Sequence, residues 1–124
     1  MPFAHSFEPE NSLLSIVGEG DVSIQDRTEC VQDILSDSSL PDKCNILLDI
    51  GLVSNDPRPE DAQQMVYLIK RLQERFRGNM AILTLPTRHV TLTHLLAASS
   101  STESRKVKAF MSVDGAKQWL QMSK

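Results

Sequence analysis

The chain lacks a long hydrophobic run and has no surplus of basic residues. Its longest apolar stretches, at 44–50 and 80–85, fall well short of the roughly 18 residues that span a bilayer. Residues 1–8 show no positive region ahead of a hydrophobic segment, so we expect no signal peptide. With 13 Lys and Arg against 16 Asp and Glu, the formal net charge is -3, which disfavours nucleic acid as a partner.

Signatures of metal, nucleotide and redox chemistry are also missing. Cys30 and Cys44 have no metal-ligand spacing, and without an export signal we expect both to be reduced and buried. His89 and His94 lie five residues apart, whereas ligands on one helix face are three or four apart. No Gly-x-Gly-x-x-Gly or Gly-Lys-Ser/Thr motif occurs. The sequence therefore predicts no metal and no cofactor.

Two short apolar runs flank an amphipathic segment. The runs are Cys44–Ile50 and Met80–Leu85. Between them, apolar residues recur at helical spacing, namely Ala62, Met65, Val66, Ile69, Leu72 and Phe76. Short apolar runs around such a helix are typical of a parallel β-α-β unit whose strands are buried on both faces.

Turn and cap residues divide the rest of the chain. We expect strands at 3–7, 13–17 and 107–111, helices at 23–35, 60–77, 92–98 and 114–122, and a polar, mobile segment at 99–104. Gly78 is predicted to close the second helix in a left-handed conformation, and Thr91 to cap the third. The prediction is one α/β domain over residues 1–124. It has a single mixed, mostly parallel sheet, the order β-β-α-β-α-β-α-β-α, and helices packed on the sheet.

Four segments resemble a known family. They are Gly18–Ser23, Ile46–Asp49, Met80–Leu83, and Val107–Phe110 followed by Ala116–Leu120. Their order resembles a STAS-type domain, the fold of bacterial anti-sigma-factor antagonists, in particular its STAS/CRAL-TRIO-like branch of unassigned function. The resemblance implies a bacterial, cytoplasmic module that binds or regulates without covalent chemistry. It also implies a protein partner or a second copy of the chain, or else a small apolar or anionic ligand.

The resemblance stops at the regulatory motif. In regulatory STAS domains the aspartate at the strand end leads into Asp-Ser-(Ser/Thr)-Gly, whose serine is phosphorylated. Here Asp49 is followed by Ile50, Gly51, Leu52 and Val53, with Ser54 nearby in a different context. The phosphorylation switch therefore cannot be transferred to Ser54.

Polar residues follow the predicted strands. In open α/β sheets ligands bind beyond the carboxyl ends of the strands. The candidate binding residues there are Asp49, Ser54, Asp56, Arg58, Thr87, Arg88 and His89, joined at the same edge by Asn55, Thr84, Ser112 and Asp114. Such residues also serve as caps and turn formers, so Asp49 either caps a turn, pairs with Arg88 or faces a ligand.

Three functions remain open at this stage. The first is a binding or interaction module, with Tyr67 and Leu68 as half-exposed contact residues and the N-terminal edge strand as a dimer surface. The second, from the CRAL-TRIO side of the resemblance, is a small lipid or apolar-ligand binding protein. The third is a small enzyme that uses Asp49 with His89 for acid-base chemistry.

Overall fold

One five-stranded sheet organises the chain, and the computed structural model describes residues 2–86 and 89–122. Its strands are β1 (Phe3–Glu8), β2 (Leu13–Gly20), β3 (Asn45–Val53), β4 (Met80–Leu83) and β5 (Val107–Phe110), in that spatial order. β1 is antiparallel to β2, and the other neighbours are parallel. The predicted fold class is confirmed, including the parallel pairing of β3 with β4.

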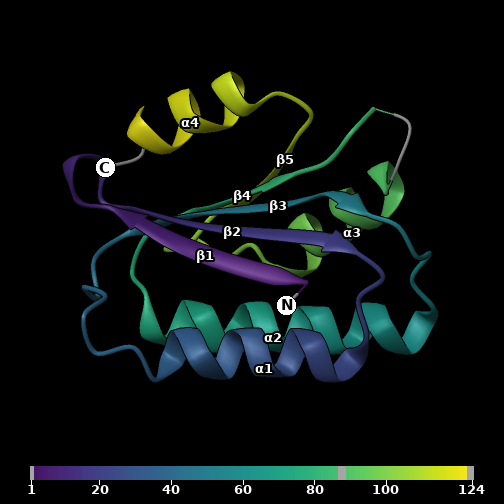
Figure 1. Cartoon of the computed structure of the whole chain (residues 1–124). Coiled ribbons are helices and arrows are strands. Elements are labelled where there is room, and N and C mark those ends of the chain that lie inside the picture. The colour runs from purple at the N-terminus through teal and green to yellow at the C-terminus, as the bar shows by residue number, and fades with distance from the viewer. Residues whose placement is uncertain (1, 87–88, 123–124) are drawn as a thin grey trace.

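Helices cover the two faces of the sheet unequally (Figure 1). They are α1 (Ile24–Leu35), α2 (Pro59–Arg75), α3 (Val90–Ser100) and α4 (Val113–Met122), with a short 3-10 turn at Pro9–Asn11. α1 and α2 lie side by side beneath the sheet, α3 packs next to α2, and α4 crosses the opposite face over β3, β4 and β5. No helix among the described residues has the length and apolar character of a membrane span.

Alternating side chains explain why the central strands read as continuous apolar runs. On one face Leu14, Ile46 and Ile82 pack into the larger core beneath α1, α2 and α3. On the other face Leu47 and Leu83 pack into a smaller core beneath α4. Because successive residues of a strand point to opposite faces, a strand covered on both sides must be apolar at every position.

Several predicted details are wrong. β3 continues to Val53, three residues beyond its predicted end, because its neighbour β2 continues to Gly20 and the two pair across a register shift. Gly78 does not adopt the left-handed conformation. Its role is spatial, since a Cβ there would lie 2.1 Å from the carbonyl oxygen of Cys44.

The third helix and its flanks also differ from expectation. α3 begins after His89, not Thr91, and its last turn contains Ser99 and Ser100, which the sequence predicts to be part of the mobile segment. Thr102 and Arg105 close the turn that follows through reciprocal hydrogen bonds. Tyr67 is exposed as predicted, but Leu68 is buried in the core.

Candidate functional site

An apolar cavity lies between the sheet and the three helices beneath it. Its volume is about 80 Å³, and it is partly open to solvent. Its walls come from every surrounding element: Phe3, Ile16, Leu48, Ile50, Val53, Cys30, Val31, Met65, Leu68, Ile69, Leu72, Leu92 and Leu96. A cavity of about 150 Å³ in another protein admits benzene. This cavity is smaller, so without rearrangement it has room for a group smaller than benzene, such as a short alkyl chain.

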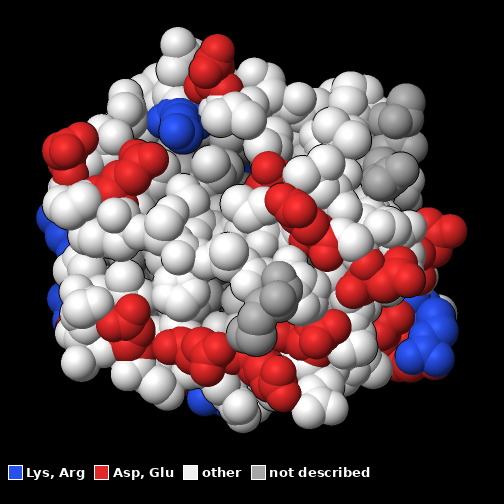
Figure 2. Space-filling view, viewed as in Figure 1, with Lys and Arg blue, Asp and Glu red and all other residues white. Residues whose placement is uncertain are grey.

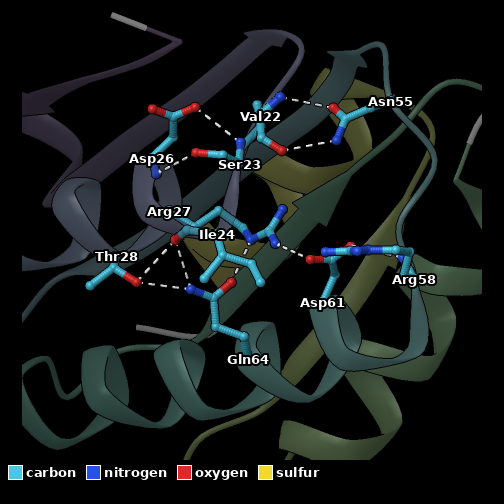
Figure 3. Close-up of polar contacts among 10 residues, drawn as sticks. All are labelled: Val22, Ser23, Ile24, Asp26, Arg27, Thr28, Asn55, Arg58, Asp61 and Gln64. Carbon is cyan, nitrogen blue, oxygen red and sulfur yellow. Dashed lines mark hydrogen bonds and ion pairs between the residues drawn. The ribbon is translucent and has the colours of Figure 1, made fainter.

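Arg27 is the charged residue in the wall of this cavity. It is only 8% exposed, because it lies on the apolar side of α1, which packs on the core. Its Nε donates to Gln64 Oε1 at 2.7 Å, and its Nη2 donates to Asp61 Oδ1 at 2.7 Å (Figure 3). No described residue accepts a hydrogen bond from Nη1, which points away from both partners in Figure 3. Among the described residues, Ser100 Oγ is the one fully buried side-chain polar atom without a partner, so Nη1 keeps contact with solvent and its donors remain available there.

Asp61 holds Arg27 in this place. The main-chain N–H of Arg58 donates to Asp61 Oδ2 at 2.8 Å, and this bond, together with the charge of Arg27, lowers the pKa of the Asp61 carboxyl below its ordinary value. The exposed Arg58 guanidinium lies 3.4 Å from the same oxygen. Two guanidinium groups thus share one carboxylate, which leaves a net positive charge beside the cavity.

Gln64 and Asn55 fix the polar rim. Gln64 accepts from Arg27 and donates to Ile24 O and Thr28 Oγ1, both at 2.8 Å, so it ties α2 to α1. Asn55 accepts from the Val22 N–H at 2.8 Å and donates to the Val22 carbonyl at 2.9 Å (Figure 3). Both polar atoms of Asn55 are engaged, so it shapes the rim by clamping two loops together.

His89 closes the far side of the cavity. It precedes α3 with a φ of 62°, a left-handed conformation that costs a non-glycine residue free energy. Its Nε2 lies 2.8 Å from the Val53 carbonyl oxygen. A carbonyl only accepts, so Nε2 carries the proton and Nδ1 is free to accept a hydrogen bond when the ring is neutral.

The strand-end residues predicted to bind are only partly brought together. His89 lines the cavity, and Arg58 is linked to it through Asp61. Asp49 is not part of the site, because it alternates with the cavity-lining Leu48 and Ile50 and so faces the other side of the sheet. Its carboxylate accepts the Gly51 N–H at 3.0 Å, a local hydrogen bond within β3.

The other residues predicted to bind a ligand do not form part of the cavity wall as described. Ser54 and Asp56 are exposed in the loop between β3 and α2, and they do not line the cavity. Thr87 and Arg88 lie outside the described residues. Thr84 is buried at the end of β4, and the Ser112 hydroxyl accepts the Gly115 N–H at the start of α4.

Sequence analysis missed Arg27 and Asp61 as site residues. The signal was present, because Arg27 lies among Ile24, Val31 and Ile34 on one face of its helix. A charge on a face that packs against the core must find a buried partner. Asp61 occupies the matching place on α2, one turn before Met65.

Burial governs the chemistry of the two thiols. Cys30 lines the cavity, and burial raises its pKa to about 11, as it does for Cys44, so both thiols are neutral near pH 7. Among residues 2–86 and 89–122, no three His, Cys, Asp or Glu side chains are grouped to hold a metal ion.

Comparison with known proteins supports the fold. No protein-family profile matches the chain, and no curated protein matches it significantly in sequence. Among solved structures, the chain is similar to an uncharacterized protein of the DUF3478 family from Shewanella loihica, described as having a SpoIIAA-like fold. The two share 18% sequence identity and a TM-score of 0.67, over 95% of this chain and 93% of the other. The fold is therefore SpoIIAA-like, which is the STAS fold.

Proposed function

We propose that this protein is a non-catalytic, STAS-like binding module for a small amphiphilic molecule. The apolar end of the ligand occupies the cavity beneath the sheet. Its anionic or hydrogen-bond-accepting end meets Arg27. The observation that carries the proposal is the Arg27 guanidinium in a mainly apolar cavity wall, with Nε and Nη2 bound to protein acceptors and Nη1 bound to none among the described residues.

Charge supports an anionic group on the ligand. The carboxylate of Asp61 is shared between Arg27 and Arg58, so the local charge is positive. A charge-assisted hydrogen bond from a partly desolvated guanidinium is about twice as strong as a neutral one. His89 also lines the cavity, and its neutral ring has an acceptor in Nδ1, which suits a ligand that also carries a hydroxyl group.

A homologous series of fatty-acid anions tests the proposal. Acetate, butanoate, hexanoate, octanoate and decanoate are titrated into the protein, and binding is followed by calorimetry and by the shift in melting temperature. Burial of each added methylene contributes about 0.8 kcal/mol, so affinity should rise about fourfold per methylene until the cavity is full. A ligand at about 100 times its dissociation constant should stabilise the fold by about 2.7 kcal/mol.

Matched variants locate the binding. Leu48→Phe places a larger side chain in the cavity wall and should abolish the dependence on chain length. Leu52→Phe adds the same group on the exposed side of β3 and should bind like the wild type. The proposal fails if affinity does not change along the series, or if Leu48→Phe binds hexanoate as tightly as Leu52→Phe does.

A further inference from the structure

The outer edge of β1 is open, and this surface is separate from the cavity mouth. Within residues 2–86 and 89–122, β1 pairs only with β2 and forms one end of the sheet. The Pro2 carbonyl accepts the Glu19 N–H, so Pro2 and every second residue after it direct their backbone groups toward β2. The N–H and C=O groups of Phe3, His5 and Phe7 therefore point outward, where another strand can pair with them.

A groove runs beside this edge, between β1 and α1. Its volume is about 140 Å³, and it is lined by Pro2, Phe3, His5, Asp26, Glu29, Cys30 and Asp33. Phe3 and Cys30 also line the cavity, so they form the wall that the two spaces share. The floor of the groove is apolar, and its outer wall is a row of carboxylates.

The carboxylates on this side of α1 have no exposed basic neighbours on the same helix. Asp26, Glu29, Asp33 and Asp37 follow one another about a turn apart, and the only basic residue of α1 is the buried Arg27. Figure 2 shows Asp and Glu side chains gathered along the lower part of this face, with Lys and Arg mainly at its margins. His5 adds a titratable group, with Nε2 3.8 Å from Asp37.

The length and the negative charge of the α1 row indicate what kind of segment fits beside β1. From Asp26 to Asp37, α1 and its end advance about 16 Å at 1.5 Å per residue. A six-residue strand covers about 17 Å, with alternate side chains about 7 Å apart. A strand added to β1 would therefore place every second side chain next to the carboxylate row. Lys or Arg at those positions would be neutralised by it.

We infer that the β1 edge and the acidic row of α1 together bind an extended, basic segment of a partner protein by strand addition. A second copy of this chain is the wrong occupant. Pairing two β1 strands about a two-fold axis would bring the two acidic rows of α1 to the same side of the joined sheet. Like charges at such a junction oppose association.

A designed peptide tests this inference on the full-length protein. The probe is a fluorescent hexapeptide of alternating Val and Lys, and binding is followed by anisotropy and by backbone amide shifts. The first control replaces Lys by Glu. The second keeps every Lys but carries N-methyl groups on the amides that would face β1. The parent peptide should bind, its affinity should fall with added salt, and both controls should bind at least tenfold more weakly.

Two protein variants separate the backbone contribution from the charge contribution. His5→Pro removes an outward N–H at the centre of the edge without touching the ladder to β2, and it should abolish binding. Glu29→Gln with Asp33→Asn removes two exposed charges and should weaken binding about tenfold, as expected for two screened ion pairs. Circular dichroism verifies that both variants are folded.

Three results would overturn the inference. The N-methylated peptide binding as well as the parent would exclude strand addition. Equal binding by the Glu peptide would exclude the acidic row as a determinant. Sedimentation showing a dimer of the wild type that His5→Pro dissociates would place a second copy on this edge instead.

Discussion

Replacement of the Arg27–Asp61 pair by apolar residues gives the sharpest test of the cavity wall. The two side chains are 9% and 8% exposed, and their charged atoms are 2.7 Å apart. Removing one partner of a buried pair leaves the other charge without compensation, whereas replacing both by hydrophobic residues of similar volume is often neutral. The experiment is a double-mutant cycle with Arg27→Met, Asp61→Leu and the double variant.

The magnitudes follow from the partners that each variant leaves behind. Arg27→Met leaves Asp61 with the Arg58 N–H and its exposed guanidinium, so we expect a loss near 3 kcal/mol. Asp61→Leu leaves Arg27 with Gln64 alone and also removes the acceptor of the Arg58 N–H at the start of α2, which indicates a loss near 5 kcal/mol. The double variant loses only the hydrogen bonds to Gln64 and to Arg58 N–H, about 2 kcal/mol. The expected coupling energy is therefore about 6 kcal/mol.

Urea unfolding measures all four corners of the cycle. The single tryptophan, Trp119, packs against Phe110 with 5.6 Å between ring centroids and reports loss of the native state by fluorescence. The pair of Arg75 and Asp42 is the control, because Asp42 is 67% exposed and ion pairs with a partner open to water couple by less than about 1 kcal/mol. A coupling of similar size for both pairs would refute the reasoning that burial makes the Arg27–Asp61 pair different.

Two other predictions concern pH and packing. Because the native pKa of Asp61 is lowered, its carboxylate stabilises the fold at pH above the unfolded value near 4, and this contribution is lost as pH falls through the native pKa. The urea midpoints of the wild type and of Arg27→Met/Asp61→Leu should therefore converge below about pH 4, and a constant difference down to pH 2 would contradict this. Gly78→Ala places a Cβ 2.1 Å from the Cys44 carbonyl oxygen and should cost about 1–3 kcal/mol. Gly115 lies in α4, and a Cβ there would have its nearest contacts at 3.7 Å, to Phe110 and Ser112, so Gly115→Ala should stabilise by up to about 1 kcal/mol; an equal loss in both variants would disprove the steric argument.

Much of the fold could be predicted because the central strands have a strong local signal. Strands buried on both faces are apolar at every position, so β3 and β4 stand out, and the spacing of Met65, Ile69 and Leu72 identifies the helix between them. The end of β3 could not be placed in this way. Asp49 and Gly51 have the composition of a strand end, yet pairing with β2 extends the strand to Val53. Pairing with a distant neighbour thus outweighed local composition.

The length of β3 also bears on the place of Asp49. A strand predicted to end at Ile50 puts Asp49 next to the edge where ligands bind. In the interior of β3, alternation turns it to the face opposite the cavity. Arg27 and Asp61, unlike Asp49, could have been placed from the sequence, because each is a charge on an otherwise apolar helix face. The free-energy cost of burying either one alone is so high that their joint occurrence implies direct contact between the two helices. That contact is present between α1 and α2, and it fixes the Arg27 guanidinium in the cavity wall, where the proposed anionic ligand would meet it.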